Sequence, residues 1–596
     1  MAVHLMNTSL TLIHPLKCDF LKQVPPPRRV RTTPADARWV SCSFSSTEFP
    51  MPAPNYQRRS ANYKPTTWTH KFLQSIKIDH TDEEYEKLKA KKLKEEVRGM
   101  INDEGVEILT KLELINDIQR LGLGYHYEND IKKALDRCLS SKEEEISLHA
   151  TALRFRLLRQ HGYQVSQDVF KYFMDDNGHF KRYIQNDIKG MLSLYEAAYL
   201  ALEGEEDLLD KALVFTSEHL RDFQSKMEGY YGIAEHVSHS LELPVHRRMS
   251  RLEARWFIEA LDKSNYINSK LLELAKLDFN LVQSVHQRDL GDMSMWWNNL
   301  GLSNKLSFAR DRLMECFFWT VGMVFQPQFS HCRKGLTKVT YFITIIDDIY
   351  DVYGTLDELE QFTNLVERWD IDGVADLPDY MRLCFLALYN TINEMAYDTL
   401  KERGENIIPY LTKAWADICK AFLQEAKWSC GKCIPTFEEY LENGWRSVSG
   451  VVILTHTYFL LGQTISKQPL DCLKDCHQLL RSSSIIFRLC NDLGTSSAEI
   501  LRGESANSIT CYMNETRCSE EVARAHCISL IGKAWKELNR ILVDDDSPFD
   551  EFFVETAINL ARMAQCTYQY GDAHGAPDAT SKNRVRSLII EPISLA

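Results

Sequence analysis

Residues 339–351 read VTYFITIIDDIYD, and their pattern is the most informative one in the chain for the type of fold. An apolar run, residues 339–346, leads into three aspartates, Asp347, Asp348 and Asp351. The β-branched residues of the run would also suit a strand. A helix, however, places residues four apart on one face, so that Asp347 and Asp351 would project together. The spacing of the acids therefore favours a helix, and we predict one over the whole stretch.

The three aspartates stand at an unfavourable place for unpaired charge. Gly354 is expected to end the helix as a left-handed C′ residue, and Thr355 with Glu358 has the spacing of a capping box that starts the next helix. The aspartates would then lie in the last turns, where the helix dipole is negative, and they would repel one another. Carboxylates in such surroundings need a counter-cation or must take up protons. A solvated acidic helix end is the alternative, which the flanking apolar residues disfavour.

A second oxygen-rich cluster lies far along the chain. Asn491, Thr495 and Glu499 follow one another at four-residue intervals, so a helix would align them on one face. Oxygen ligands suit Mg²⁺ or Mn²⁺ and do not suit zinc. Taken alone, this spacing also occurs on solvated helix surfaces. A magnesium site of this kind usually serves a phosphate, so the two clusters together predict that the chain holds a diphosphate through metal ions.

Length and composition narrow the class of protein. The 596 residues exceed what one hydrophobic core supports, so at least two domains are expected. No apolar run approaches the roughly 18 residues of a membrane helix, and no membrane partner is expected. The net charge of −13 argues against nucleic-acid binding. An anionic substrate would therefore need metal ions or well-placed arginines.

The 16 cysteines are scattered along the chain. Cys430 and Cys433 form a lone CxxC pair, with no second pair at zinc spacing. Zinc or redox chemistry is therefore the less favoured interpretation. Unpaired thiols in a reducing compartment are the more favoured one.

Residues 1–57 differ from the rest of the chain. They carry lysines and arginines but few acids, and they are rich in serine, threonine and proline. The prolines at residues 25–27 prevent a regular helix there. This composition resembles an organelle transit peptide better than a secretory signal, and a disordered tail is the alternative.

Beyond about residue 80 the sequence pattern is helical almost throughout. Thr81 and Glu84 have capping-box spacing, strand-like alternation is scarce, and no short repeat is present. A domain boundary is plausible between residues 262 and 275. We expect an all-α chain with two helical domains, over residues 58–268 and 269–596.

Four motifs of the chain resemble those of plant class I terpene synthases and follow one another in the same order. The resemblance is closest to the monoterpene synthases of flowering plants. The motifs are RRx8W at Arg58, Arg59 and Trp68, RxR at Arg310 and Arg312, DDxxD at Asp347, Asp348 and Asp351, and the second metal motif at Asn491, Thr495 and Glu499. The resemblance covers the chain from about residue 58 to the C-terminus. It implies an N-terminal α-barrel-like domain without known chemistry, and a C-terminal class I terpenoid synthase domain with the metal motifs at the mouth of an apolar pocket.

The resemblance also implies what the motif residues do. A prenyl diphosphate would lose its diphosphate, and three Mg²⁺ ions, or Mn²⁺, would neutralise the departing charge. The expected metal ligands are Asp347, Asp351, Asn491, Thr495 and Glu499.

Further residues are expected to bind the substrate or to support its ligands. The expected substrate-binding residues are Arg310, Arg312, Arg488, Asp347 and Trp319, and those expected to act most directly in ionisation are Asp347, Asp351, Arg310 and Arg488. Asp348 points about 100° away from Asp347 on a helix, so Asp348, and likewise Asp492, are expected to support the ligands from behind. Arg58, Arg59 and Trp68 would help the N-terminal segment to cap the site, or would merely tie that segment to the C-terminal domain.

Aromatic faces could stabilise a carbocation, at about 0.5–2 kcal/mol each. Trp319 is the main candidate for the pocket floor. Phe342, Phe487 and Tyr568 are weaker candidates, for which ordinary core packing is the alternative. Residues 568–575 resemble the family's mobile loop, which closes over the site and excludes water.

The leader and the RRx8W motif favour geranyl diphosphate as the substrate. The expected location is the chloroplast stroma, and the enzyme is expected to be a monomer or a homodimer. Residues 443–450 look most like those of acyclic synthases that make (E)-β-ocimene or myrcene. The nearest rival is isoprene synthase, which acts on dimethylallyl diphosphate. Phe487 and Asn507 match that group, but Thr340 stands where its second pocket phenylalanine is expected. Cyclic monoterpene synthases and linalool synthases are further alternatives.

Other classes of protein fit less well. The sequence has no DxDD acid stretch, so the reaction should start by ionisation and not by protonation. A catalytically inactive helical scaffold would not need metal ligands in both clusters. A chain-elongating prenyltransferase would need a second, non-allylic substrate and usually has no N-terminal helical domain.

Overall fold

The computed structural model describes residues 58, 60–76, 83–140, 147–226, 232–264, 268–463, 465–502 and 506–595. The expected leader, residues 1–57, lies outside the described residues. The same holds for Arg59 of the RRx8W motif and for Thr81 of the first expected capping box.

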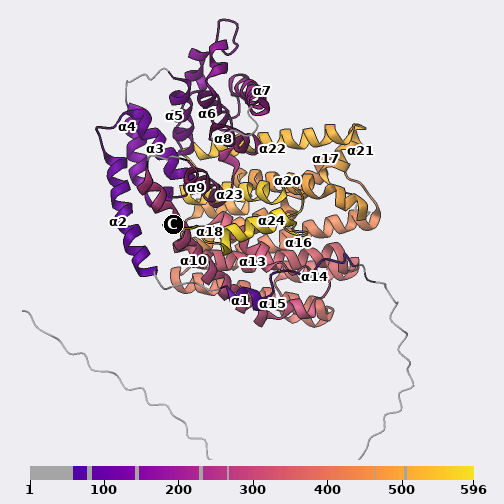
Figure 1. Cartoon of the computed structure of the whole chain (residues 1–596). Coiled ribbons are helices and arrows are strands. Elements are labelled where there is room, and N and C mark those ends of the chain that lie inside the picture. Colours follow the sequence, from indigo (N-terminus) through magenta and orange to yellow (C-terminus); the bar gives the residue numbers. More distant parts are fainter. Residues whose placement is uncertain are drawn as a thin grey trace, which may run out of the picture. The chain divides into compact units, whose positions relative to one another are not determined.

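The regular structure is helical, as the sequence predicted (Figure 1). Among the described residues no strand forms, and the one β-type pairing there is an isolated antiparallel bridge between Met174 and Phe180. The helices before the predicted domain boundary are α1 (His70–Ser75), α2 (Glu83–Asn102), α3 (Ile108–Arg120), α4 (Glu128–Ser140), α5 (Leu148–Gln160), α6 (Ile188–Ala198), α7 (Lys211–Lys226), α8 (Ile233–Glu242) and α9 (Ser250–Asp262).

The part of the chain after the boundary is also helical. Its helices are α10 (Ser269–Leu300), α11 (Leu302–Lys305), α12 (Leu313–Met323), α13 (Ser330–Asp348), α14 (Leu356–Arg368), α15 (Asp379–Arg403), α16 (Ile408–Gly431), α17 (Phe437–Ser447), α18 (Gly450–Leu460), α19 (Lys467–Lys474), α20 (Gln478–Arg502), α21 (Ser508–Thr516), α22 (Glu520–Leu542), α23 (Glu551–Tyr568) and α24 (Ala579–Val585). Short 3₁₀ or π turns lie between them at η1 (Gly124–His126), η2 (Gln167–Phe173), η3 (Arg182–Asn186), η4 (Glu206–Asp210), η5 (Val245–Arg247), η6 (Pro327–Phe329), η7 (Ile349–Tyr353), η8 (Asp372–Asp376) and η9 (Arg586–Ile590).

Residues 339–351 are helical, but the end of this helix differs from the expectation. α13 runs to Asp348 and continues into the π turn η7, in which Gly354 N–H donates to the carbonyl of Ile349 at 2.8 Å. Asp351 therefore lies in a widened turn. Gly354 ends the helix with φ −70°, so the expected left-handed conformation was wrong. Glycine is needed there for space, because a Cβ would lie 2.5 Å from Leu359 Cδ2.

α14 begins at the predicted capping box. The side chains of Thr355 and Glu358 bond reciprocally to each other's backbone N–H groups. They satisfy two donors that the start of a helix would otherwise leave unpaired. The box fixes the start of α14 a few residues beyond the aspartates.

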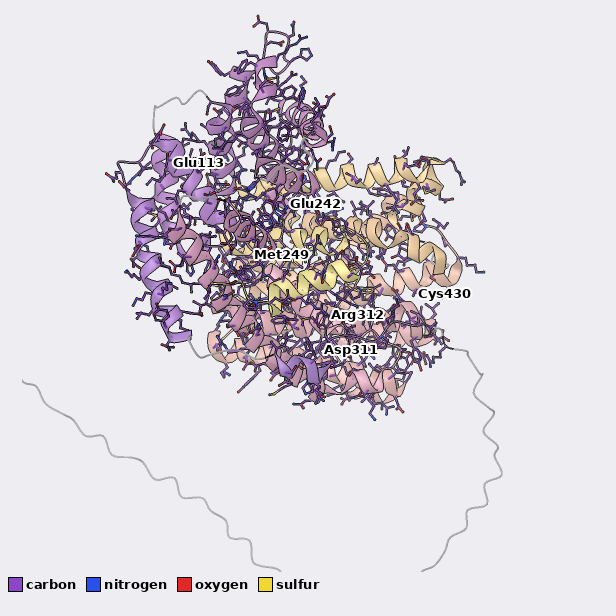
Figure 2. All side chains as sticks on the ribbon, viewed as in Figure 1. Glu113, Glu242, Met249, Asp311, Arg312 and Cys430 are labelled. Atoms are coloured by element: carbon purple, nitrogen blue, oxygen red, sulfur yellow. The ribbon has the colours of Figure 1, made fainter. Side chains whose placement is uncertain are left out.

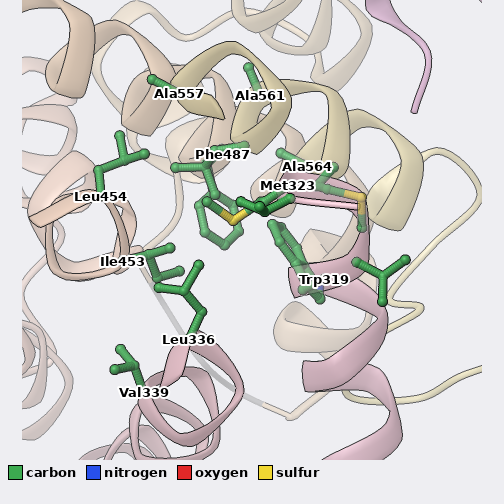
Figure 3. Close-up of a cluster of buried hydrophobic side chains, with 14 of the residues drawn as sticks. Trp319, Met323, Leu336, Val339, Ile453, Leu454, Phe487, Ala557, Ala561 and Ala564 are labelled. Carbon is green, nitrogen blue, oxygen red and sulfur yellow. The ribbon is translucent and has the colours of Figure 1, made fainter. Parts of the chain in front are cut away.

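The helices that surround the site meet in the apolar core. One buried cluster runs from Trp68 to Ile593, and a second one lies within residues 148–237. α12 packs against α13 and α23, and α20 packs against α18, α22 and α23. Figure 3 shows apolar side chains from these helices, among them Trp319 and Phe487, pointing toward a common centre.

Three other expectations concern the chain as a whole. α9 ends at Asp262 and α10 begins at Ser269, within the predicted boundary region, while the domain bounds themselves stay a prediction. No described helix combines the length and the apolarity needed to cross a membrane. The described cysteines are free thiols, and Cys430 (Figure 2) and Cys433, at the end of α16, are exposed.

Candidate active site

The first wall of the site is the end of α13. The side chain of Asp347 is 29% exposed, whereas that of Asp348 is fully buried. Asp348 accepts a hydrogen bond from the backbone N–H of Arg310 at 2.6 Å, and its other oxygen lies 2.9 Å from Nε of the same arginine. Burial raises the pKa of Asp348, and Arg310 opposes that shift. Asp348 thus holds Arg310 from behind, while Asp347 keeps contact with solvent.

Arg310 supplies the positive charge that the clustered aspartates need. Its guanidinium pairs with Asp347 as well as with Asp348. Burial lowers the pKa of Arg310, but these two carboxylates outweigh it and raise the pKa well above its ordinary value. The ring of Tyr63, 5.0 Å from the guanidinium, covers this arginine from the N-terminal segment. Sequence reasoning missed Tyr63, since nothing in its surroundings marks it.

The second wall is one face of α20. Asn491 accepts a hydrogen bond from Arg488, and the hydroxyl of Thr495 donates to the carbonyl of Asn491 at 2.9 Å. Asn507, the N-cap of α21, donates from Nδ2 to Glu499 at 3.3 Å. The three residues spaced for one helical face are therefore on one helix, and each of their three side chains makes a hydrogen bond.

Asp492 backs the second wall as Asp348 backs the first. It is fully buried and accepts hydrogen bonds from the hydroxyl of Tyr440 and the backbone N–H of Ser508, each at 3.0 Å. Arg488 lies 2.6 Å from its other oxygen. A buried carboxylate with this many partners is held in one orientation. Its place is consistent with the expected support of Arg488 and of the neighbouring ligands.

Two residues feel the charges of both walls. Glu425, on α16, is influenced by the carboxylate of Asp347 on one wall and by the guanidinium of Arg488 on the other. Tyr568, at the end of α23, is influenced by Arg488 and also by Arg310. Glu425 and Tyr568 are thus within electrostatic range of charged groups on both walls.

Glu425 is the main site residue that sequence reasoning missed. Burial raises its pKa to about 7, and Arg488 opposes the shift. Ser447 donates a hydrogen bond to it at 2.6 Å, and Asn443 donates one at 3.3 Å. No spacing rule connects it to either motif. The packing of α16 against η7 brings it to the opening.

Three aromatic side chains form one cluster, which we call the floor because the sequence predicted Trp319 there. The ring of Trp319 lies 4.7 Å from that of Phe487 and 6.4 Å from that of Tyr568. Figure 3 shows Trp319 and Phe487 facing one another across the cluster. Phe342, in contrast, is fully buried and lies 6.1 Å from Trp296, so it packs in the core away from this group. Of the weaker candidates, Phe487 and Tyr568 join Trp319, and Phe342 does not.

Two segments lie against the opening, which we name the N-terminal cover (residues 60–69) and the C-terminal cover (residues 569–578). Arg312 donates hydrogen bonds to the carbonyl of Lys64 in the first and to that of Gly575 in the second. The structure therefore does not bring Arg312 to the carboxylates that Arg310 contacts. Its expected contact with diphosphate stays a prediction.

Arg58 anchors the start of the N-terminal cover. Its two terminal nitrogens bond to the carboxylate of Glu358 at 2.6 and 2.7 Å, and its guanidinium lies 4.7 Å from the ring centroid of Tyr353. Trp68, at the other end of the cover, is 4% exposed and belongs to the core. Both alternatives for the RRx8W motif fit these contacts, because the anchored segment lies beside the opening.

The predicted metal ligands are oxygen donors divided between two walls. The described residues contain no group of three or more His, Cys, Asp or Glu side chains already arranged around one metal position. Two of the predicted ligands, Asn491 and Thr495, are of other residue types. The ligand roles therefore stay predictions, while the donor chemistry fits a hard divalent cation such as Mg²⁺.

The chain is thus an all-α protein in which arginines and carboxylates of two helices lie near a cluster of aromatic side chains. Comparison with known families gives the identity of the fold. The model of the terpene synthase N-terminal domain matches residues 67–241, and that of the terpene synthase family metal binding domain matches residues 298–537. The chain belongs to the terpene synthase family, whose members are lyases that act on prenyl diphosphates. The family and the two-domain all-α fold expected from the sequence are confirmed.

Relatives are similar over nearly their whole length. Probable terpene synthase 12 of Ricinus communis is 62% identical over 93% of this chain and 94% of its own. The chloroplastic tricyclene synthase TPS4 of Medicago truncatula is 56% identical over 90% and 93%, and the chloroplastic myrcene synthase of Quercus ilex is 50% identical over 94% and 93%. The structure of isoprene synthase from grey poplar leaves (Populus x canescens), in complex with three Mg²⁺ ions and dimethylallyl-S-thiolodiphosphate, is 55% identical, with a TM-score of 0.82 over 89% of this chain and 99% of that one.

Proposed function

We propose that the chain is a monoterpene synthase, which ionises geranyl diphosphate and releases diphosphate and an acyclic monoterpene such as (E)-β-ocimene or myrcene. The observation that carries the proposal is the convergence of Arg310 and Arg488 with two oxygen-bearing walls above one aromatic floor. A diphosphate at the opening would place its hydrocarbon chain on that floor. The tricyclene and myrcene synthases among the relatives are named for C10 hydrocarbons, which supports the C10 substrate.

Divalent ions complete the site in this proposal. Asp347 and Asp351 would hold them on the first wall, and Asn491, Thr495 and Glu499 would hold them on the second. The isoprene synthase structure holds three Mg²⁺ ions, and we infer the same number here, or Mn²⁺ in their place. Bound there, the ions would neutralise the diphosphate and act as Lewis acids toward the leaving oxygen.

The arginines of the walls would hold the diphosphate. Arg310 now pairs with Asp347, and Arg488 pairs with Asn491 and Asp492. A guanidinium offers planar pairs of donors that match phosphate oxygens. When the substrate binds, Arg310 would therefore move from the carboxylate of Asp347 to diphosphate oxygens. Arg488 would likewise move from the amide of Asn491 and the carboxylate of Asp492.

The floor and the covers would control the cation. The C–O bond breaks, the electron pair leaves with the diphosphate, and a geranyl cation remains over Trp319, Phe487 and Tyr568. Each ring face stabilises a nearby cation by about 0.5–2 kcal/mol. Loss of one proton, to the released diphosphate, gives an acyclic C10 hydrocarbon before a ring closes. The two covers would keep water from the cation during this time.

Isoprene synthase activity on dimethylallyl diphosphate is the second candidate. The presence of Phe487 in the floor and the similarity to the grey poplar enzyme favour it. Thr340 opposes it. This residue keeps 7% of its surface accessible although it lies within α13, and its hydroxyl donates back to the carbonyl of Leu336 at 3.0 Å. A small side chain at such a position would leave depth for the longer C10 chain. Cyclic monoterpene and linalool synthases are further outcomes of the test below.

The location and the assembly are part of the proposal. The named relatives include several chloroplastic enzymes, which together with the composition of residues 1–57 supports a plastid enzyme. We propose the chloroplast stroma as its location and a monomer or homodimer as its state.

One experiment separates these activities. The purified chain is incubated with Mg²⁺ and, in turn, with dimethylallyl, geranyl and farnesyl diphosphate, while diphosphate release and volatile products are measured by gas chromatography. We expect the highest kcat/KM with geranyl diphosphate and an acyclic C10 product. A preference for dimethylallyl diphosphate would establish the second candidate. No release from any of the three, in a chain that is folded by circular dichroism, would refute the proposed function.

A further inference from the structure

The two arginines of the RxR pair have different partners. Arg310 pairs with the carboxylates of Asp347 and Asp348. The hydrogen bonds of Arg312 go instead to backbone carbonyls, including that of Asp311, although its side chain is almost completely buried (Figure 2 labels both residues). Contacts of this kind depend on the fixed directions of the guanidinium N–H groups more than on charge.

A single nitrogen of Arg312 joins the two covers. Nη2 donates to the carbonyl of Lys64 at 3.1 Å and to that of Gly575 at 2.9 Å. Lys64 belongs to the N-terminal cover and Gly575 to the C-terminal cover. Two segments from opposite ends of the chain therefore share one donor, which is fixed at the N-cap of α12.

The C-terminal cover is shaped for this approach. Asp572 Oδ1 accepts hydrogen bonds from the backbone N–H groups of His574 at 3.1 Å and Gly575 at 2.7 Å, which makes a tight turn. A Cβ at position 575 would lie 2.3 Å from Asp572 Oδ2 and 3.2 Å from Arg310 Nη1. A residue without a side chain is therefore required where the turn meets the arginines.

A small cavity beneath both covers provides a second contact between them. It is lined by Glu315, one turn beyond Arg312 on α12, by Trp68 of the N-terminal cover and by His574 of the C-terminal cover. Glu315 Oε2, Trp68 Nε1 and His574 Nδ1 are buried. The indole N–H of Trp68 acts on the Glu315 carboxylate, while His574 Nδ1 has no hydrogen-bond partner within the protein. Polar atoms that line a cavity in this way are usually bridged by ordered water. Both covers thus also meet at the same turn of α12.

We propose that the first turn of α12 is a shared seat for the two covers, and that Arg312 is a positioning residue that couples their closure. When one cover docks, the guanidinium of Arg312 is oriented for the other, so that the covers close together over the opening. The inference rests on the proposed function, because joint closure serves a reaction whose cation must be kept from water. It gives Arg312 a role distinct from that of Arg310.

Hydrogen exchange of the full chain, measured by mass spectrometry, tests the coupling without turnover. Arg312→Lys keeps the charge but loses the planar donor pair, and it should speed exchange in both covers about tenfold, the effect of one lost hydrogen bond. Gly575→Ala adds a methyl group in the C-terminal cover, beside Asp572 and Arg310, and it should also speed exchange in residues 60–69. Arg517→Lys, at an exposed arginine, is the matched control and should change neither cover.

The double variant sharpens the test. Because Arg312→Lys and Gly575→Ala break the same link, together they should speed exchange in residues 60–69 no more than Arg312→Lys alone. Faster exchange confined to residues 569–578 in Gly575→Ala, or additive effects of the two changes on residues 60–69, would overturn the proposal.

Product analysis distinguishes this role from a diphosphate contact. With geranyl diphosphate, Arg312→Lys should raise the share of water-captured alcohols several-fold, while inhibition by inorganic diphosphate stays within about twofold of the unchanged chain. If Arg312 is instead a diphosphate ligand, that inhibition weakens and the alcohol share stays constant. If the unchanged chain releases no diphosphate at all, the proposed function fails, while the exchange experiment still decides whether the covers are coupled.

Discussion

The ion pair between Arg58 and Glu358 gives the most quantitative prediction. Arg58→Ala should free the N-terminal cover from α14 while the rest of the fold is retained. Arg58 bonds to Glu358 through two nitrogens, donates to the carbonyl of Tyr353 at 3.0 Å and lies over the ring of Tyr380 at 5.2 Å. The change removes all of these contacts at once and leaves the capping box of α14 in place.

The size of the effect follows from the pKa of Glu358. Burial opposes ionisation, but the hydrogen bonds from Arg58, Thr355 and Tyr380 lower the pKa from 4.5 to about 2. At about 1.4 kcal/mol per pKa unit, the whole shift corresponds to about 3 kcal/mol. Arg58 is one of three donors, and its side chain is 31% exposed, so solvent screening reduces its share. We expect a loss of about 1–2 kcal/mol, which is about 5- to 30-fold in the attachment equilibrium.

Hydrogen exchange in residues 60–69 measures this equilibrium. Exchange there should be about 5- to 30-fold faster in Arg58→Ala than in the unchanged chain. The pKa of Glu358 is lower in the attached state, so attachment is at full strength above pH 4.5 and is lost as the pH falls toward about 2. The difference between the two chains should therefore be constant from about pH 6 to 8. Equal exchange rates in residues 60–69 would show that Arg58 does not hold the cover.

Four further predictions concern the site and the leader. Asp347→Ala should lower diphosphate release by about 100-fold or more with an unchanged melting temperature, and near-normal release would refute its ligand role. Thr340→Phe should shift the ratio of C5 to C10 turnover toward dimethylallyl diphosphate, and a constant ratio would refute the pocket-depth argument. Burial raises the pKa of Glu315 from 4.5 to about 7, so the folded state loses stability as the pH rises through this window. Glu315→Gln should remove about 1–3 kcal/mol of that pH dependence, measured by thermal unfolding. An unchanged slope of stability against pH would contradict this prediction. Deleting residues 1–57 should preserve soluble, active enzyme, since it leaves Arg58 and its bonds to Glu358 in place, and loss of activity would show that the leader is structural.

The features that the sequence predicted correctly are local ones. The four-residue spacing of Asn491, Thr495 and Glu499 needs only the period of a helix, and the capping box at Thr355 needs only three residues of chain. An apolar run that ends in acids is likewise visible without tertiary structure. The π turn after Asp348 was not predicted, because one extra residue in a turn leaves no mark in residue types.

Residues that reach the site through packing could not be predicted. Glu425 arrives because α16 packs against η7, and Tyr63 arrives because the N-terminal cover crosses the first wall. Phe342 shows the reverse. It lies in the same apolar stretch as the aspartates, but the helix turns its ring toward Trp296 and away from the floor. An aromatic residue close to a motif in sequence is therefore weak evidence for a place in the pocket.

The different partners of Arg310 and Arg312 follow from where α12 begins. On an extended chain, the side chains of Arg310 and Arg312 would point to the same side, because they are two residues apart, as the motif suggests. The helix starts at Leu313, however, and Arg312 is its N-cap with φ −133° and ψ 38°, so the backbone turns between the two arginines. Glu315 lies three residues further on, one turn along and on the same face as Arg312. Because the helix starts where it does, Arg310 contacts the carboxylates, whereas Arg312 lies on the same face of α12 as Glu315, beneath the covers. The RxR motif alone does not show this difference.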